Sequence, residues 1–504
     1  MWLLDALEKY KNSEEVAVIH SYEKTSFREL WNKSECIAGF LQKNEGVTQG
    51  KVPVVIYGNK ETDILAVMHG ALKTGVPYVP VDTSYPVERL EKIMNQIGSC
   101  VLVDFTGSMS AADDVTIVNS DTLSEIYNDY QNFQSDRSHW VKDDDVCYIL
   151  FTSGSTGEPK GVPIRKRNIV NFVEWARTFA VKRNKSGNIA MNQVSYSFDV
   201  SVFALYLFLS EGYTIFSFDK NTLGDMRLLL EQMAKSHISV WVSTPAFAEM
   251  CCIDDNFKQS MLPELERFIV AGEVLTKRLV KEMWNRFPGL TVINGYGPTE
   301  CTVLLTACEI TEKMVQAEDS LPIGKILSDG NIKLLNPKVI DGQEVGELSV
   351  VSKSVGGEYF RNPAKTKERF YYDESLQQYG YKTGDLVYLK GNLLYYIGRM
   401  DSQIKLNGYR IELDDISENL NKLDYVANSV VLPVKEEGAV KYLVAFIKLS
   451  KDTGLSKLKL LITIKKDLGK LVPSYMIPKK IVIVDDFPLN VNGKIDRKKL
   501  MEGI

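Results

Sequence analysis

The sequence predicts an α/β protein, with a large N-terminal unit of alternating strands and helices and a smaller α+β unit at the C-terminal end. Three observations support this prediction. Short apolar runs alternate with amphipathic stretches over most of the 504 residues. The alternation gives way to a different pattern near residue 400. At roughly 150 residues per domain, the length itself suggests about three globular units.

The strand–helix alternation is clearest near the N-terminus. Residues 54–57 form a short apolar run typical of a buried strand, and residues 62–73 carry apolar side chains at helical spacing. A second strand over residues 78–81 and a second helix over residues 87–97 follow. Repeated strand–helix units predict parallel sheets that are covered by helices.

Two further strands are expected over residues 146–151 and 290–293, each directly before a glycine-containing loop. The most apolar run covers residues 202–209. It is far shorter than the roughly 20 residues that a membrane helix needs. We therefore expect this run to lie in the core.

The C-terminal part begins with a strand over residues 392–397, which Gly398–Asp401 is expected to interrupt. The elements predicted beyond it are a helix over 411–423, strands over 429–434 and 442–449, a helix over 457–471 and a strand over 480–484. A mixed segment of roughly 100 residues favours a separate small domain. We divide the chain into residues 1–400 and 401–504, with a hinge at Asp401.

Composition excludes several classes of function. The net charge of −5 gives no overall basic field for nucleic acid or anionic lipid. The seven cysteines form no CxxC pair and the four histidines are dispersed, which favours reduced thiols and no metal cluster. The first residues lack the basic and apolar regions of a signal peptide. We expect a cytoplasmic protein without membrane insertion or nucleic-acid binding.

The strongest local signal is the loop TSGSTGEPKG over residues 152–161, directly after a predicted strand. Glycines allow the backbone to bring N–H groups close to an anion, and the hydroxyls and Lys160 add donors and positive charge. The loop is not a Walker A sequence, because Pro159 stands where the second glycine is required. It predicts a phosphate-binding loop, and a polar surface loop is the alternative.

The second signal is NGYGPTE over residues 294–300. The first two glycines have GxG spacing, but Glu300 replaces the third glycine, so a dinucleotide-binding fingerprint is excluded. Tyr296, between the glycines, could stack on a flat base, and Glu300 could hold Mg²⁺ beside phosphates. An ordinary turn explains the isolated segment equally well.

Two shorter motifs follow. The segment YKTGDL over residues 381–386 places Asp385 at an expected strand–turn boundary, where its carboxylate could accept hydrogen bonds from ribose hydroxyls. A structural cap is the alternative for such an aspartate. The segment NGKIDR over residues 492–497 places Lys494 in a turn of the small domain. Domain closure could bring Lys494 into a cleft, whereas a solvated surface lysine is the alternative.

The order and spacing of these four segments, together with residues 398–412, resemble the ANL adenylate-forming superfamily over essentially the whole chain. Within the superfamily the chain is similar to amino-acid adenylation enzymes. It is most similar to the stand-alone D-alanine–D-alanyl carrier protein ligases, which start the D-alanylation of teichoic acids. The segments SFDVSV (197–202), STP (243–245) and QIKLNGYR (403–410) carry this closer similarity.

The resemblance implies a fold and an activity. The ANL fold has a large unit of layered αβ subdomains with a distorted β-barrel, and a small mobile α+β domain. The implied activity is ATP- and Mg²⁺-dependent activation of an amino acid, most favourably D-alanine, as its adenylate. Transfer to the phosphopantetheine thiol of a carrier protein would follow. No carrier domain is recognised in the chain, so we expect the carrier to act in trans.

The resemblance also implies which residues form the site. The residues expected at ATP are Thr152, Ser153, Gly154, Lys160, Asn294, Gly295, Tyr296, Thr299, Asp385, Tyr396, Arg399 and Lys494. The residues expected at the amino acid are Asp199, Ala271, Val303 and Lys494. By the same resemblance, Glu300 helps to bind Mg²⁺. Lys494 is the catalytic lysine, which bridges the substrate carboxylate, the α-phosphate and the ribose.

Asp199 is flanked by apolar Phe198 and Val200, so its carboxylate is expected to be partly buried. An unpaired buried carboxylate costs several kcal/mol, which makes a ligand ammonium a suitable partner. The resemblance assigns Asp199 this role toward the α-ammonium of the amino acid. A helix N-cap is the alternative.

The identity of the amino acid is less constrained than the reaction. The D-alanine ligases in the comparison carry cysteine where this chain has Ala271, and Ala246 and Gly295 are also small. One methylene is worth only about 1–3 kcal/mol of discrimination, so small changes can switch a preference. A stand-alone nonribosomal-peptide-type enzyme for a larger apolar or aromatic amino acid is the first alternative. An acyl- or aryl-CoA ligase, which would not need Asp199, and a non-catalytic nucleotide-binding protein are the others.

Overall fold

The computed structural model describes residues 2–21, 23–110, 114–154, 158–182, 188–317, 320–436, 438–451, 453–488 and 495–502. The chain separates into two compact units. The first unit comprises Met1–Thr83, Gln96–Phe151 and Gly161–Met400. The second unit comprises Ser84–Asn95, Thr152–Lys160 and Asp401–Ile504.

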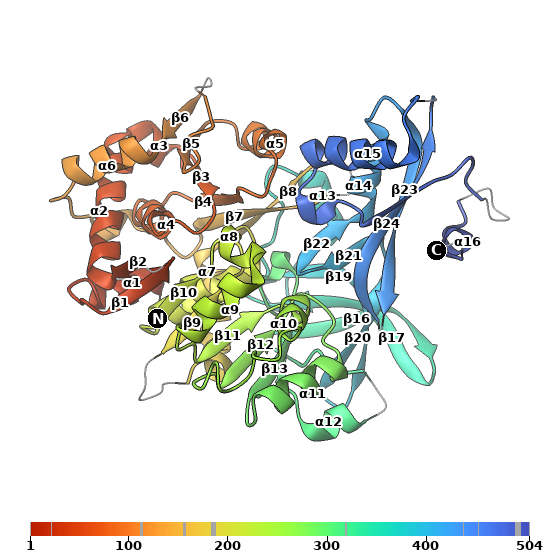
Figure 1. Ribbon diagram of the computed structural model, residues 1–504. Helices are drawn as coiled ribbons and strands as arrows, with labels where there is room; N and C mark the ends of the chain where they lie inside the picture. The colour runs from red at the N-terminus through yellow and green to blue at the C-terminus, as the bar shows by residue number, and fades with distance from the viewer. Residues whose placement is uncertain are drawn as a thin grey trace. The chain divides into compact units, whose positions relative to one another are not determined.

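A six-stranded sheet in the order β6-β5-β3-β4-β7-β8 forms the first layer (Figure 1). Its strands are β3 (Val54–Gly58), β4 (Tyr78–Asp82), β5 (Cys100–Asp104), β6 (Val115–Val118), β7 (Val146–Thr152) and β8 (Lys160–Arg165). The strand β3 pairs in parallel with both β4 and β5. The connecting helices are α4 (Asp63–Lys73) and α5 (Val87–Ile97). The predicted strand–helix alternation is therefore confirmed.

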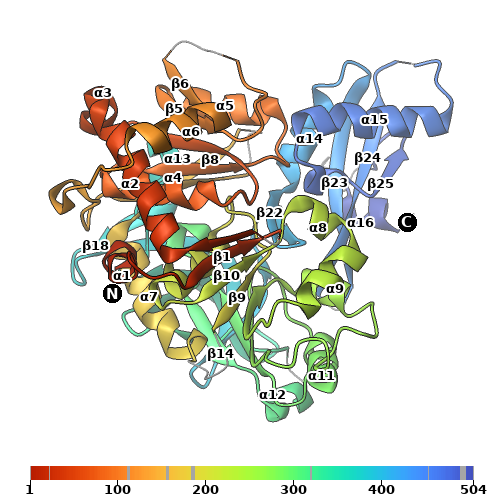
Figure 2. The same cartoon turned by 60° about the vertical axis from the view of Figure 1, so that its left-hand side comes forward.

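A nine-stranded sheet in the order β15-β14-β13-β12-β11-β9-β10-β1-β2 forms the second layer. Its strands are β1 (Val16–His20), β2 (Glu23–Ser26), β9 (Ile189–Asn192), β10 (Thr214–Ser217), β11 (Val240–Ser243), β12 (Arg267–Val270), β13 (Thr291–Tyr296), β14 (Thr306–Glu309) and β15 (Lys325–Ile326). The run from β1 to β13 is parallel, and β1 pairs with β10 far along the chain (Figure 2).

Local capping defines where several helices of the first unit begin. The Ser26 hydroxyl accepts from the Glu29 backbone N–H, and the Ser26 N–H donates to the Glu29 carboxylate, so the two form a capping box at the start of α2 (Phe27–Lys43). The other helices of the unit are α1 (Leu3–Lys9), α3 (Glu45–Gln49), α6 (Ser120–Asp129), α7 (Lys166–Ala180), α8 (Lys220–Gly224), α9 (Met226–Ala234), α10 (Pro245–Cys251), α11 (Lys277–Arg286), α12 (Glu312–Gln316) and α13 (Pro363–Arg369). The apolar run over residues 202–209 is buried throughout, as predicted.

An antiparallel sheet completes the first unit. Its strands are β16 (Asn331–Ile340), β17 (Gln343–Val351), β18 (Phe370–Asp373), β19 (Gln378–Lys390) and β20 (Leu393–Arg399). Two expectations about it were wrong. Asp385 lies inside β19 rather than at its end, because Gly384 adopts a left-handed φ of 74° next to a shift in register that lets the strand continue. Gly398 does not interrupt β20, which stays paired to β19 through Arg399.

The second unit contains a short hairpin and a three-stranded sheet. The hairpin strands are β21 (Gln403–Leu406) and β22 (Tyr409–Glu412), and the sheet consists of β23 (Val426–Glu436), β24 (Ala439–Leu449) and β25 (Lys480–Ile483). The helices are α14 (Leu413–Asn421), α15 (Lys457–Leu471) and α16 (Arg497–Met501), and residues 87–95 of α5 also belong to this unit. The helix predicted from residue 411 begins two residues later, because Asn407 and Gly408 both have positive φ and form the turn that folds β22 onto β21.

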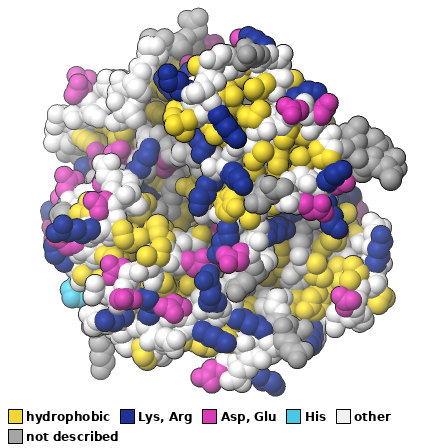
Figure 3. Space-filling view, turned by 45° about the vertical axis from the view of Figure 1, so that its right-hand side comes forward, with side chains coloured by type: hydrophobic (Ala, Val, Ile, Leu, Met, Phe, Trp, Pro, Cys, Tyr) yellow, Lys and Arg dark blue, Asp and Glu magenta, His cyan; other side chains and the backbone are white. Residues whose placement is uncertain are grey.

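Surface charge is the feature relevant to nucleic-acid binding, and the length and apolarity of the helices are the features relevant to membrane insertion. Basic and acidic side chains are interspersed on the face shown in Figure 3. Among the described residues, no helix is both long and apolar enough to cross a lipid bilayer.

Candidate functional site

The carboxyl ends of β9, β11, β12 and β13 meet at one edge of the nine-stranded sheet. Ser243 pairs in register with Val270, and Val270 pairs with Asn294. Ligands of open α/β sheets bind beyond the carboxyl ends of parallel strands. Three of the predicted site segments begin at this edge: the one leading to Asp199, the one at Ala271, and residues 294–300.

Close backbone packing requires a glycine at residue 297, and Gly295 lies against the Leu304 side chain. A Cβ on Gly297 would lie 2.5 Å from the Val303 carbonyl oxygen and 2.6 Å from the Leu304 Cα. A Cβ on Gly295 would lie 2.6 Å from a Leu304 methyl group. The buried Asn294 side chain donates to the Pro322 carbonyl oxygen at 2.8 Å. The segment was expected to follow its strand, whereas β13 extends through Tyr296.

Three predicted nucleotide residues form one connected cluster. The Tyr296 hydroxyl donates to Asp385 Oδ2 at 2.5 Å, and Arg399 Nη1 donates to Asp385 Oδ1 at 2.7 Å. Burial, reinforced by the Asp385 charge, raises the pKa of Tyr296 well above its usual value, so its phenol stays protonated. The ring of Tyr396 lies 6.5 Å from that of Tyr296, centroid to centroid. An ionised carboxylate offers about four lone-pair sites, so Asp385 retains acceptor capacity for a ligand hydroxyl.

Glu300 is fully buried behind two tyrosines. The Tyr359 hydroxyl donates to Glu300 Oε1 at 2.7 Å, and the Tyr381 hydroxyl lies 3.0 Å from that of Tyr359. The Gly356 N–H donates to the Glu300 carbonyl oxygen at 2.9 Å. A carboxylate is the hard oxygen donor that Mg²⁺ prefers. The residue therefore fits a magnesium ligand.

Sequence reasoning missed Tyr359. The available signal was the glycine pair at residues 356–357, which lies two residues before Tyr359. Glycine often marks a site where another backbone approaches closely. Here the approach brings the Gly356 backbone to Glu300.

A strained turn follows Glu300 (Thr299–Cys301 form a 3-10 turn). Thr302 and Val303 have φ values of 56° and 71°, which β-branched residues rarely adopt. The Thr302 hydroxyl donates to the Ser354 carbonyl oxygen at 2.7 Å, and the Leu305 N–H donates to the Tyr296 carbonyl oxygen at 2.7 Å. These contacts hold Val303, a predicted amino-acid residue, in a conformation that costs about 1–3 kcal/mol per strained residue.

Asp199 and Ala271 lie at the sheet edge where the amino acid is expected. Asp199 is half-buried and begins a 3-10 turn, and the N-cap position of that turn is Phe198 rather than Asp199. Its charge contributes, after burial, to raising the pKa of the buried Tyr148 hydroxyl. Ala271 is buried, and its N–H donates to the Ser243 carbonyl oxygen at 3.1 Å. The N-cap alternative for Asp199 is not supported.

The predicted phosphate loop belongs to the second unit, and its residues 155–157 lie outside the described part of the chain. The Ser153 hydroxyl donates to the Arg410 carbonyl oxygen at 2.9 Å and accepts from the Glu412 N–H at 3.2 Å. A Cβ on Gly154 would lie 2.2 Å from the Glu158 carbonyl oxygen, so glycine is required there. The Thr152 hydroxyl donates to the carbonyl oxygen of Lys160, the first residue of β8, at 3.4 Å.

Two predicted residues are not part of these clusters. Lys494 lies outside the described residues. Asp401 is the first residue of the segment Asp401–Ile504 in the second unit, and its Oδ1 accepts from the Gln403 N–H at 3.3 Å. Within the described ranges, no group of three or more His, Cys, Asp and Glu side chains could hold a metal ion.

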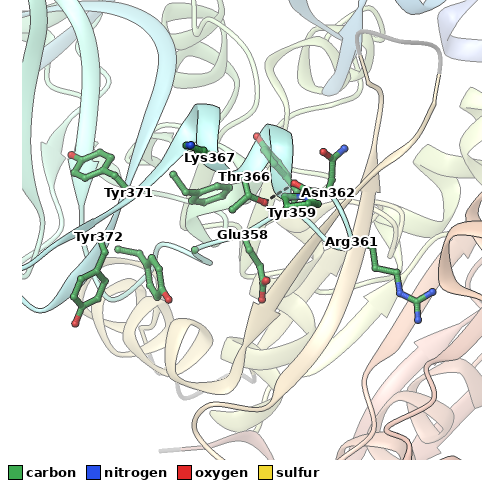
Figure 4. A pocket seen from close by; sticks show the side chains of 12 residues that line it. Glu358, Tyr359, Arg361, Asn362, Thr366, Lys367, Tyr371 and Tyr372 are labelled. Carbon is green, nitrogen blue, oxygen red and sulfur yellow. Dashed lines mark hydrogen bonds between the residues drawn. The ribbon is translucent and has the colours of Figure 1, made fainter.

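A pocket of about 350 Å³ lies beside α13, outside the predicted site (Figure 4). It is lined by Tyr359, Thr366, Lys367, Tyr371 and Tyr372, among others. The Tyr359 N–H donates to the Thr366 hydroxyl at 2.9 Å, while the Tyr359 hydroxyl reaches Glu300. One tyrosine therefore lines this pocket and also contacts the candidate magnesium ligand.

Comparison with known proteins agrees with this geometry. The sequence profile of the AMP-binding enzymes matches residues 6–360, and that of the AMP-binding enzyme C-terminal domain matches residues 415–494. The D-alanine--D-alanyl carrier protein ligase of Bacillus velezensis is 37% identical over 510 residues, and that of Bacillus licheniformis is 36% identical over 517 residues. Both comparisons cover all of this chain and all of the relative.

Solved structures share the fold at lower identity. The Vibrio cholerae adenylation domain AlmE, in complex with glycyl-adenosine-5'-phosphate, aligns with a TM-score of 0.79 and 18% identity, covering 99% of this chain and 96% of that chain. An artificially fused adenylation–PCP di-domain from Klebsiella oxytoca aligns with a TM-score of 0.80 and 21% identity, covering 95% and 93%. With the sequence profiles, the full-length relatives and the fold in agreement, the chain belongs to the family of AMP-binding enzymes.

Proposed function

We propose that this protein activates D-alanine with ATP as D-alanyl-adenylate and transfers the D-alanyl group to the phosphopantetheine thiol of a separate carrier protein. The observation that carries the proposal is the full-length similarity, at 34–37% identity, to proteins named D-alanine--D-alanyl carrier protein ligase. This similarity favours D-alanine over a larger amino acid, although the small side chain of Ala271 would leave space for a larger one. Lipoteichoic acid D-alanylation is the pathway that such an enzyme would serve.

The nucleotide would bind at the edge of β13 and the antiparallel sheet. Asp385, oriented by Tyr296 and Arg399, would accept hydrogen bonds from the two ribose hydroxyls. The rings of Tyr296 and Tyr396 would contact the adenosine. Asn294, Gly295 and Thr299 would contribute backbone and polar contacts beside them. The support for these roles is the connected cluster of Tyr296, Asp385 and Arg399.

The phosphates and the metal would lie near the segment that ends at Glu300. Glu300 would hold Mg²⁺, which when bound offsets the negative charge of the phosphates. The Thr152–Lys160 loop, with Ser153, Gly154 and Lys160, would hold the β- and γ-phosphates through hydroxyl, backbone and ammonium donors. Its glycine at residue 154 is required by backbone packing, which fits a tight anion-binding turn.

The amino acid would bind beyond the ends of β9 and β12. Asp199 would pair with its α-ammonium, and Ala271 and Val303 would line the space for the side chain. A half-buried carboxylate gains most from a cationic ligand, because the ion pair forms in a partly desolvated site. The positive φ of Val303 would hold its side chain in a defined position there.

The chemistry needs positioning and charge stabilisation more than acid–base groups. A carboxylate oxygen of the amino acid attacks the α-phosphorus of ATP, the new P–O bond forms, and pyrophosphate leaves with the electrons of the broken bond. The carboxylate is already ionised, so no general base is required. Lys494 would offset the charge that develops between carboxylate and phosphate. The carrier thiolate then attacks the acyl carbon, and AMP leaves.

The two half-reactions would use the two parts of the chain differently. We propose that residues 1–400 bind the nucleotide and amino acid, and that residues 401–504 form a mobile lid that carries Lys494 and turns at Asp401. The carrier protein would act in trans. We place the reaction in the cytoplasm, because all seven cysteines are free thiols, as expected of a reducing compartment.

The test is amino-acid-dependent exchange of pyrophosphate into ATP, with D-alanine, L-alanine, glycine, D-serine and a set of larger apolar and aromatic amino acids. We expect D-alanine to give the strongest exchange. Asp199→Ala should abolish most of it, since the α-ammonium loses its partner, whereas the exposed Asp121→Ala control should retain it. Stronger exchange with a larger amino acid would overturn the D-alanine assignment. Full activity of Asp199→Ala with a simple carboxylic acid would identify an acyl-CoA ligase instead.

A further inference from the structure

Lys60 is a buried cation that the proposed chemistry does not use. It follows β3, on the loop that leads to α4, and its side chain is only 2% exposed. Its Nζ donates to the Val194 carbonyl oxygen at 2.5 Å and to Asn192 Oδ1 at 3.2 Å. It also lies 3.7 Å from the centroid of the Tyr196 ring. A lysine of the six-stranded sheet therefore reaches the end of β9 in the nine-stranded sheet.

The end of β4 holds the same segment from the same side. Asp82 Oδ2 accepts from the Ser195 hydroxyl at 2.6 Å, and the Pro80 carbonyl oxygen accepts from the Ser197 hydroxyl at 3.2 Å. Residues 192–197 thus contact Lys60, on the loop after β3, and Asp82 and Pro80 of β4. Asp199 follows only two residues after Ser197.

Burying the charged form of Lys60 costs free energy, and the neighbouring negative charges offset this cost only in part. Burial lowers the pKa of Lys60 to about 7, although the negative charges of Asp82 and Glu61 act to raise it. His20 also faces this cluster, and burial lowers its pKa as well, so it is neutral above pH 7. Burial raises the pKa of Tyr196, whose ring therefore remains neutral. Unlike an ordinary surface lysine, Lys60 changes its charge within the physiological pH range.

We propose that Lys60 is a positioning residue for amino-acid binding, which holds residues 192–197 so that Asp199 faces the substrate α-ammonium. The inference rests on the proposed function and deepens it by adding a residue to the amino-acid site. Lys60 does not contact the nucleotide cluster of Tyr296, Asp385 and Arg399, so its effect is confined to the amino acid.

Protonation of Lys60 sets how strongly the segment is held. The ammonium donates charge-assisted hydrogen bonds to Val194 and Asn192, which are roughly twice as strong as those of a neutral amine. Below pH 7 the charged form predominates and the segment is held firmly. Above pH 7 the amine predominates and the hold weakens. The KM for the amino acid therefore rises between pH 6 and 8, while the KM for ATP does not follow it.

The experiment compares wild-type chain and Lys60→Met in pyrophosphate exchange, varying the amino acid and ATP separately at pH values from 6 to 8. Methionine keeps the length of the side chain without its donors. We expect the KM for the amino acid at pH 6 to rise about tenfold, as for the loss of hydrogen bonds from a charged donor. The KM for ATP should stay within about twofold, and the pH dependence of the amino-acid KM should disappear.

Lys73→Met is the matched control. Lys73 is buried in α4, its Nζ donates to Glu35 Oε1 at 2.7 Å, and burial lowers its pKa to about 8. Its partners lie on α2, away from residues 192–199. We expect Lys73→Met to lower the Tm without selectively raising the amino-acid KM. This separates a general effect of losing a buried lysine from the positioning effect.

Each outcome has a distinct meaning. A wild-type chain without any amino-acid-dependent exchange would overturn the proposed function and the inference with it. Normal wild-type exchange with an unchanged amino-acid KM in Lys60→Met would overturn the inference alone, as would equal increases in the KM for amino acid and ATP. If Lys60→Met does not fold, the wild-type profile decides, because an amino-acid KM that stays constant from pH 6 to 8 contradicts the proposal.

Discussion

The hydroxyl of Tyr359 donates a hydrogen bond to the candidate magnesium ligand, Glu300, at 2.7 Å. Tyr359→Phe removes this donor and leaves the ring in place, so the Glu300 carboxylate loses a contact that helps to orient it. We expect the Mg²⁺ concentration for half-maximal exchange to rise about 3- to 10-fold, in line with a lost hydrogen bond to a charged group. The increase in Tm produced by Mg²⁺-ATP should shrink in parallel.

Tyr371→Phe is the control for this prediction. The Tyr371 hydroxyl lies 2.8 Å from the Ser349 hydroxyl, and this hydrogen bond does not involve Glu300. Tyr371 lines the same pocket as Tyr359. We expect Tyr371→Phe to keep the wild-type dependence on Mg²⁺. Equal Mg²⁺ dependence in both variants would show that the Tyr359 hydroxyl does not position Glu300.

Sequence reasoning named candidate residues that sit in local motifs, and missed contacts that join distant segments. Tyr296 and Asp385 stand in recognisable segments, and the structure brings them together at 2.5 Å. Tyr359 contacts Glu300 across 59 residues of sequence, and Lys60 contacts Val194 across 134. No periodicity or spacing within a short window encodes such pairs, because they arise when separate layers pack.

The conformation of residues 297–305 depends on the absence of a side chain at Gly297. Gly297→Ala would place a Cβ 2.5 Å from the Val303 carbonyl oxygen, and the clash is with backbone that cannot rotate away. We expect the first unit to lose about 1–3 kcal/mol of stability and the enzyme to lose most of its exchange activity, because the strained turn must shift. Chemical denaturation and pyrophosphate exchange measure the two effects.

Gly224→Ala is the control for the Gly297→Ala prediction. Gly224 ends α8, and a Cβ there would meet no atom within 4 Å. We expect wild-type activity and unchanged or slightly raised stability, since alanine loses less conformational freedom on folding than glycine does. Similar losses in both variants would mean that the close approach at Gly297 is not what limits the segment.

Sequence reasoning identified most elements correctly and erred at particular ends. The helix over 457–471 was predicted with its observed bounds, because its helical apolar pattern extends over many residues and the Ser456 side chain caps its start. The helix expected from residue 411 was placed too early, since Ile411 and Glu412 fit a helical pattern but pair with β21. Tertiary pairing overrides local preference where a strand and a helix adjoin without a breaking residue.

At the scale of the whole molecule, one buried histidine contributes to acid sensitivity. His69 lies in α4, and burial, with a smaller contribution from Lys73, lowers its pKa from 6.5 to about 3. Above pH 6.5 it is neutral in both the folded and the unfolded state. Between pH 6.5 and 3 only the unfolded state binds the proton, so unfolding is favoured as pH falls.

This sets a stability prediction for the full chain. We expect His69 to contribute up to about 1.4 kcal/mol of lost stability per pH unit as pH falls from 6.5 toward 4. His69→Leu should flatten the dependence of the urea midpoint on pH in that window. An equally steep pH dependence in wild type and His69→Leu would contradict the assignment.

The α/β class and the change of character near residue 400 could be predicted, whereas the order of strands could not. The sequence has no signal for placing residues 16–26 at the edge of a sheet built mainly from residues 189–326. That placement follows from which edge is left open once the central parallel strands have formed. It is a property of the assembled sheet rather than of any one segment.

The pairing of β1 with β10 has a consequence for biosynthesis. Val18 lies opposite Ile215, so the partner of β1 emerges from the ribosome about 200 residues later. At a synthesis rate of roughly 5–20 residues per second, β1 waits for about 10–40 s before that partner exists. During this interval its apolar edge is open to chaperones or to other nascent chains, and a pause in translation before residue 214 would lengthen the exposure.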